Sequence, residues 1–195
     1  MQQKFSRAFI LRMILLIEAG CLLVATIWSA LAKIDLLPML TLKDPGLLAV
    51  GVLVGLSTSS SSLLLSWLGK KLANRIAFLN HFCELVENVM APIFATITIL
   101  DILLISMASG FCEEVMYRGV MQSQFGLIAA SIIFGLCHYA GPRYLFYVIW
   151  AAVVGALFGV LLTITGCLWV PVVAHMTSNF LSLCILRYKI AGVSE

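Results

Sequence analysis

The chain has 195 residues, of which 62% are hydrophobic and 11% are charged. Soluble domains carry about 25% charged residues, so this composition excludes a soluble enzyme or binding module and indicates a membrane protein in contact with the lipid bilayer. The net charge of +3 does not indicate a partner nucleic acid, because the basic residues stand at the ends of apolar runs. The six cysteines form no CxxC pair and are typical of small apolar core residues.

Two long apolar runs occupy the first third of the chain, at about residues 13–31 and 46–68. Each is long enough to cross a hydrocarbon core of about 30 Å, which needs roughly 20 residues. Glu18 lies in the first turns of the first run, where we expect it to reach the membrane surface or to pair with Arg12. Prolines and charged residues between the two runs predict a loop. Hydroxyl residues at 57–62 can bond to helix carbonyls or to a neighbouring helix.

The middle of the chain is mixed and then becomes apolar. Polar and apolar residues alternate at 73–90, which predicts an interfacial amphipathic helix. From Pro92 an apolar stretch begins that is too long for one straight span. We expect a bend at 109–110, where a serine precedes a glycine, and a turn at 125–126.

Three further apolar runs follow, at 127–139, 144–165 and 168–186. Gly155 and Gly159 are four residues apart and predict a small-residue face for close helix packing. The sequence therefore predicts an all-α fold: a polytopic transmembrane helix bundle of about six spans plus the interfacial amphipathic helix.

We expect one membrane-embedded domain, 1–195, with N-terminal helices at 13–68 and a catalytic helix core at 92–188. Most basic residues that flank the spans fall on one side of this topology, and by the positive-inside rule that side is cytoplasmic. The expected location is the inner (cell) membrane of a bacterium, with both termini cytoplasmic. No motif indicates an oligomeric state.

The stretch GFCEEVMYRGVMQSQFG places Glu113, Glu114 and Arg118 in a chain that otherwise excludes charge. An unpaired ionised carboxylate is costly in an apolar medium, so such groups are paired and usually functional. Glu114 and Arg118 are four residues apart, the spacing at which opposite charges meet on a helix. Glu113 lies about 100° around the helix from Glu114 and is free to face another group.

Other polar residues are predicted at the same depth in the membrane. Glu113 and His138 each lie about 12 residues from the turn that separates them, which corresponds to about 18 Å along a helix. His175 and Asn179 lie about 14 and 19 Å from the turn at 165–166 by the same rise, and they share a helix face. The polar side chains of three helices, which are energetically unfavourable in lipid, are therefore expected to converge.

These residues resemble the CPBP family of intramembrane proteases, which includes CAAX proteases and bacteriocin-processing enzymes and is also called the Abi family. The family carries EExxxR, then FxxxH, then HxxxN or HxxxH. The three motifs stand here in that order at 113–118, 134–138 and 175–179. The resemblance covers about 110–183, and the first two apolar runs carry none of its motifs.

The resemblance implies a role for each motif residue. Glu113 would be the general base that takes a proton from water, with His138 holding or polarising that water. His175 and Asn179 would donate hydrogen bonds to the oxyanion formed at the scissile carbonyl. Glu114 and Arg118 would be a supporting pair.

The resemblance leaves the cofactor open, because family members are described both as metalloproteases and as glutamate-dependent proteases. Glu113, His138 and His175 could hold one zinc ion with water as the fourth ligand. Asn179 is a poor zinc ligand and a good oxyanion donor, which favours a site without metal.

The leading hypothesis is an intramembrane endopeptidase that cleaves peptides or membrane-protein tails. The alternatives are a non-proteolytic membrane scaffold or bacteriocin-immunity protein of the same fold, and a proton-coupled transporter. Other intramembrane proteases fit the sequence less well. HExxH is absent, an aspartyl type needs a second acid beside Asp101, and a serine type would have to use Ser57.

Overall fold

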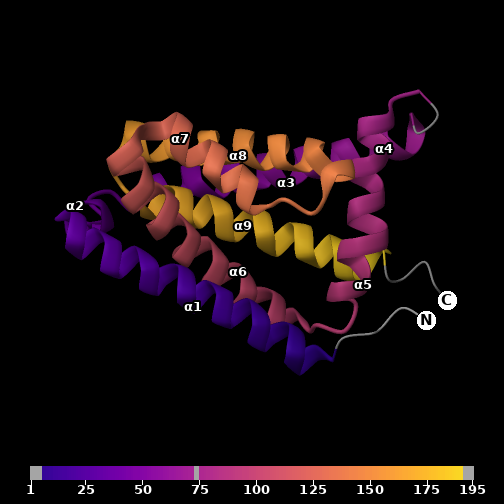
Figure 1. The fold of residues 1–195 in the computed structure, drawn as a ribbon, viewed down its shortest axis with the longest axis horizontal. Coiled ribbons are helices and arrows are strands. Elements are labelled where there is room, and N and C mark those ends of the chain that lie inside the picture. The colour runs from indigo at the N-terminus through magenta and orange to yellow at the C-terminus, as the bar shows by residue number, and fades with distance from the viewer. Residues whose placement is uncertain (1–5, 73–74, 191–195) are drawn as a thin grey trace.

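The computed structural model describes residues 6–72 and 75–190, and within them all regular structure is helical. The predicted all-α fold is thereby confirmed. The longest helices run side by side as a bundle (Figure 1). They are α1 (Arg7–Ala32), α3 (Leu47–Lys71), α6 (Ile99–Glu114), α7 (Gln122–Cys137), α8 (Leu145–Thr165) and α9 (Trp169–Ile185).

Five helical segments are long and apolar enough to cross a membrane: Arg7–Ala32, Leu47–Lys71, Ile99–Cys137, Pro142–Thr165 and Trp169–Tyr188. The third segment reverses at Gly126, whose φ of 82° and ψ of 170° are not helical, so the bundle contains six legs. Glycine suits this position because a side chain is strained at positive φ. The second leg of the hairpin, 127–137, is only about 16 Å long at 1.5 Å per residue, which is shorter than a hydrocarbon core of about 30 Å.

The expected bend at 109–110 is wrong, because α6 continues without a break to Glu114. Gly110 serves close packing instead: a Cβ atom there would lie 2.6 Å from Cγ of Met176 on α9. The irregular stretch is the wide π-helical turn η2 (Val115–Met121), which joins α6 to α7. The helix therefore changes its winding just after the paired glutamates.

The segment predicted as an interfacial helix forms α4 (Ala77–Glu84), the π-helical η1 (Leu85–Met90) and α5 (Ala91–Phe94). These short helices cross one end of the bundle, near the start of α1 and the end of α9 (Figure 1). None of them is long enough to span a membrane. Burial raises the pKa of the Cys83 thiol on α4, which keeps it uncharged. Residues 73–74 of the predicted helix, and the two chain ends, lie outside the described residues.

The predicted loop between the first two spans contains one helical turn, α2 (Leu37–Leu40). It is tied to the start of α9, because the Leu168 amide donates to the Met39 carbonyl at 2.8 Å. The Trp169 indole donates to the Leu40 carbonyl, also at 2.8 Å. This loop therefore closes the bundle at the end opposite α4.

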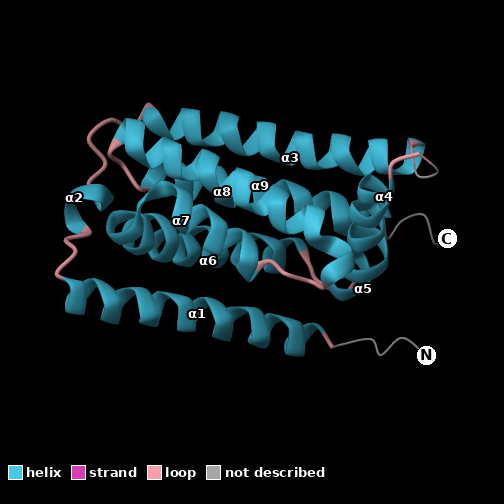
Figure 2. Cartoon of the chain, turned by 45° about the horizontal axis from the view of Figure 1, so that its top comes forward, coloured by secondary structure: helices cyan, strands magenta, loops and turns pink. Residues whose placement is uncertain are grey.

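Glycines set how closely the helices approach. A Cβ atom at Gly55 on α3 would lie 2.5 Å from the Ala174 carbonyl oxygen of α9. A Cβ atom at Gly155 on α8 would lie 2.9 Å from the Phe134 ring of α7, as the small-residue face predicted. Figure 2 shows α1 and α3 on the outer sides of the bundle, with α6 to α9 between them.

Candidate active site

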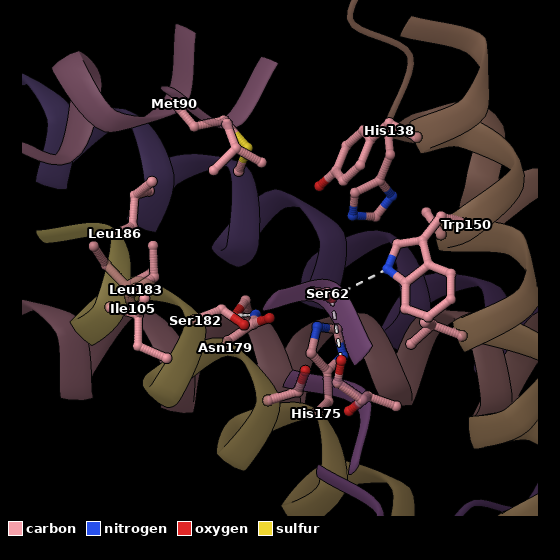
Figure 3. A pocket seen from close by; sticks show the side chains of 18 of the residues that line it. Ser62, Met90, Ile105, His138, Trp150, His175, Asn179, Ser182, Leu183 and Leu186 are labelled. Atoms are coloured by element: carbon pink, nitrogen blue, oxygen red, sulfur yellow. Dashed lines mark hydrogen bonds between the residues drawn. The ribbon is translucent and has the colours of Figure 1, made fainter. Parts of the chain in front are cut away.

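A cavity of about 360 Å³ lies inside the bundle. Its wall includes all four residues predicted to carry chemistry: Glu113 from α6, His138 from the end of α7, and His175 and Asn179 from α9. Figure 3 shows the labelled histidine rings on the wall of this pocket, with Met90, Leu183 and Leu186 at its apolar end. The structure therefore brings the expected residues of three helices around one space.

Glu114 and Arg118 lie behind the cavity wall and are almost completely buried, with exposed fractions of 0% and 1%. Arg118 Nε lies 3.2 Å from Glu114 Oε2, so the ion pair expected from their spacing is present. The guanidinium also donates to the Gly155 carbonyl at 3.0 Å and lies 4.4 Å from the centroid of the Phe134 ring. The absence of a side chain at Gly155 leaves room for these contacts, so groups from α6, α7 and α8 surround the buried charge, although Nε and Nη1 have no hydrogen-bond partner among the described residues.

The second oxygen of Glu114 holds His175, a contact that the sequence did not reveal. Glu114 Oε1 lies 2.8 Å from His175 Nδ1. A carboxylate can only accept, so Nδ1 carries the hydrogen and Nε2 is left for the cavity. As a neutral ring Nε2 accepts a hydrogen bond, and as an imidazolium, which an adjacent carboxylate stabilises, it donates one. Glu114 therefore pairs with Arg118 and also orients His175.

His138 lies just after the last turn of α7, and the helix backbone holds its ring. Its Nδ1 lies 2.8 Å from the Phe134 carbonyl oxygen, one helical turn earlier. The carbonyl accepts, so Nδ1 donates and Nε2 has a free lone pair. The Phe134 ring lies between the two histidines, with centroid distances of 4.6 Å to His138 and 6.0 Å to His175. Phe134 of the FxxxH motif thus orients His138 through its carbonyl and packs its ring against both histidines.

Asn179 lies one turn after His175 on the same face of α9. Its Nδ2 donates to Ser109 Oγ on α6 at 2.9 Å. The amide has two hydrogens on that nitrogen, so one remains after this bond. Ser109 was not predicted as part of the site, because no spacing rule relates it to Asn179, which is 70 residues away.

Glu113 differs sharply from its neighbour Glu114. It lines the cavity, and its Oε2 is buried with no hydrogen-bond partner. An unsatisfied buried carboxylate oxygen is costly unless water or a ligand meets it. The arrangement therefore offers this oxygen to a molecule in the cavity.

Metal binding was left open by the sequence. In the described part of the chain, no three His, Cys, Asp or Glu side chains lie close enough together to hold a metal ion. Glu113, His138 and His175 are not such a group in this arrangement. His81 and Glu84 on α4 do not belong to such a group either.

Glu18 was expected to reach the membrane surface or to pair with Arg12, and that expectation is wrong. It is 6% exposed and lines the same cavity as Glu113.

Asp101, which had no visible partner in the sequence, accepts hydrogen bonds from Arg7 at 2.6 and 2.8 Å. It also caps the start of α6. The signal in the sequence was a carboxylate within an apolar run.

The hydroxyl residues of α3 act as predicted, both within the helix and towards other helices. Ser57 Oγ donates to the Leu53 carbonyl at 2.9 Å and does not line the cavity, so it does not supply a serine nucleophile. Ser62 does line the cavity, and it accepts a hydrogen bond from the Trp150 indole at 3.2 Å (Figure 3).

Comparison with known proteins concerns the segment that carries the three motifs. Residues 95–181 match the family model for "Type II CAAX prenyl endopeptidase Rce1-like", which confirms the resemblance over a segment that contains all three motifs. The chain is also 33% identical over 97 residues to the uncharacterized protein YpbD of Bacillus subtilis (strain 168). That match covers 50% of this chain and 51% of the relative, so the chain spans about half the length of the curated relative it matches. No solved structure matches.

Proposed function

We propose that this membrane protein, whose residues 95–181 match the Rce1-like proteases, is an intramembrane endopeptidase that hydrolyses peptide bonds of peptides or membrane-protein tails. The observation that carries the proposal is the cavity shared by Glu113, His138, His175 and Asn179. A carboxylate without a counter-ion and two oriented histidines on the wall of one cavity are the groups that water-mediated acyl transfer needs.

Glu113 activates the water. Its free carboxylate oxygen accepts one water proton, while His138 Nε2 accepts a hydrogen bond from the other and fixes the direction of attack. General base catalysis of this kind contributes about 10²–10⁴-fold to the rate. The Phe134 carbonyl holds the His138 ring on the wall of the cavity, where it can meet this water.

His175 and Asn179 stabilise the oxyanion that forms when water adds to the carbonyl carbon. The ring of His175 is held by Glu114, so Nε2 as an imidazolium donates to that oxygen. The second hydrogen of the Asn179 amide donates beside it, since Ser109 takes the first. Each such donor is worth about 10²–10³-fold in kcat.

The apolar end of the cavity suggests the kind of substrate. Met90, Leu183 and Leu186 line this end, whereas the polar groups lie at the other. We expect a substrate with an apolar part beside the scissile bond, in keeping with the prenyl endopeptidases that give the matching family its description. The apolar part would be buried among these side chains and would place the carbonyl near Glu113.

The test is cleavage by the purified protein in detergent or vesicles, read by mass spectrometry with membrane-protein extracts as substrate. Glu113→Ala should lose activity by at least about 10²-fold and remain folded, since Glu113 forms no ion pair with the described residues that its removal would break. Glu87→Gln is the matched control, because this carboxylate lies on η1 outside the cavity. Wild-type activity in Glu113→Ala would contradict the assigned base. A scaffold or immunity protein would be indicated instead if Glu113→Ala corrects whatever growth defect deletion of the gene causes.

Chelation tests the metal question. No step above passes through a metal ion, so treatment with a strong chelator followed by dialysis should leave the cleavage rate unchanged. Loss of activity that returns with zinc would contradict this part of the proposal.

A further inference from the structure

Glu18 is a buried carboxyl group of the cavity that none of the three motifs includes. It lies on α1, outside the segment that matches the family model. Its exposed fraction is 6%, and its Oε2 has no hydrogen-bond partner. An acid in this state inside an apolar helix is expensive, which indicates a function.

The Glu18 carboxyl group lies next to that of Glu113. Both residues line the same cavity, in each of them Oε2 is buried without a hydrogen-bond partner among the described residues, and the charge of Glu113 acts on Glu18. A hydrogen bond between two carboxyl groups requires that one of them carries a proton. Two adjacent carboxylates in a poorly solvated site repel each other, so such pairs share one proton.

Contacts along α1 hold Glu18 in this place. Arg7, near the start of the helix, binds Asp101 on α6 through two hydrogen bonds. One turn after Glu18, the Cys21 thiol donates to the Cys112 carbonyl at 3.7 Å. Trp28, near the end of the helix, donates to Gln124. The helix is therefore anchored to α6 on both sides of Glu18, and to α7 near its end.

We propose that Glu18 is a second catalytic residue of this site and acts with Glu113 as a carboxyl pair. This inference rests on the proposed endopeptidase function. Before reaction Glu113 is ionised and Glu18 carries the shared proton. Glu113 takes a proton from water, the water oxygen bonds to the carbonyl carbon, and the π electrons of the carbonyl move to its oxygen.

Glu18 then donates its proton to the leaving nitrogen. The carbonyl re-forms and the C–N bond breaks, which releases an amine and a carboxylic acid for the one water consumed. The pair still holds one proton, now on Glu113, and it returns to Glu18. Protonation of the nitrogen is required because an amide anion is too basic to leave.

The kinetic test compares Glu18→Gln with wild type. Glutamine keeps the shape and can form hydrogen bonds, but it cannot release a proton, so kcat should fall about 10²–10⁴-fold with little change in KM. Thr26→Val is the matched control on the same helix, since its hydroxyl donates to the Leu22 carbonyl of α1 itself and does not line the cavity; it should keep kcat. Wild-type kcat in Glu18→Gln would overturn the inference.

The outcomes separate this inference from the function on which it rests. If Glu113→Ala is inactive and Glu18→Gln is fully active, only the role of Glu18 is wrong. If both variants cleave like wild type, the proposed endopeptidase site is wrong as well.

A second measurement does not depend on turnover. Infrared difference spectra between wild type and the Glu18→Gln/Glu113→Gln double variant should show the carbonyl stretch of one protonated carboxylic acid at neutral pH. The absence of that band would overturn the shared proton even for a preparation with no measurable cleavage.

Discussion

Glu114 and Glu18 are both buried carboxyl groups, yet they are held in different ways. In the matched segment, 95–181, Glu114 binds Arg118 through one oxygen and His175 through the other. On α1, Glu18 faces the cavity with one oxygen unsatisfied and another acid, Glu113, as its neighbour. A carboxylate held by an arginine and a histidine stabilises the fold and orients a ring, whereas one without such partners is available to a substrate or to water.

The same contrast separates Glu113 from Glu114, although they are adjacent in sequence. Changes to paired groups should cost stability, and changes to groups that face the cavity should cost turnover. Two predictions test this division, and a third tests the packing of α3 on α9; they follow in order of decreasing effect.

The largest effect on stability is expected from Glu114→Ala. The change leaves the Arg118 charge buried without its carboxylate, which typically costs about 3–5 kcal/mol. Thermal unfolding in detergent should therefore show a large loss of stability, together with loss of cleavage as His175 loses its partner. Glu87→Ala, which removes only the half-exposed partner of Lys70, should unfold almost as wild type does. If the two variants unfold at the same temperature, Glu114 does not stabilise the fold in the way that we infer.

Asn179→Ala should affect turnover and not stability. Loss of one oxyanion donor lowers kcat by about 10²–10³-fold, or about 2.7–4 kcal/mol of transition-state stabilisation. Ser109→Ala is the control, because it removes the group that positions the amide and leaves the donor itself. We expect a smaller fall in kcat for Ser109→Ala. If the two variants have the same kcat, Asn179 acts only through its contact with Ser109.

Gly55→Val tests the helices outside the matched segment. A Cβ atom at this position would lie 2.5 Å from the Ala174 carbonyl of α9, so α3 must move away from the helix that carries His175. Overpacking of this kind costs about 1–3 kcal/mol. Gly20→Val on α1 is the control, because a Cβ atom there has no neighbour within 4 Å. Unfolding curves that coincide for the two variants would contradict close packing of α3 on α9.

Features with a local cause could be predicted from the sequence. Hydropathy and length identified the six legs, because a span must hide its own backbone polar groups from lipid whatever its neighbours are. The spacing of Glu114 and Arg118 predicted their ion pair, since residues four apart meet on any helix. Turn positions and the rise per residue placed the motif residues at one depth, and the structure puts them around one cavity.

Other features depend on how each helix is rotated about its axis and where it crosses its neighbours. The contact of Glu114 with His175 joins residues 61 apart, and that of Arg7 with Asp101 joins residues 94 apart. The sequence predicted a bend at Gly110, whereas in the structure Gly110 packs closely against Met176.

The sequence by itself determined which side chains are too costly to leave in lipid, because that cost belongs to the residue. Only the tertiary structure decided that Glu18 turns towards Glu113 and that Glu114 holds His175. Side chains on helices far apart in the sequence meet only because of how the helices pack. The spacing of residues along the chain does not predict such contacts.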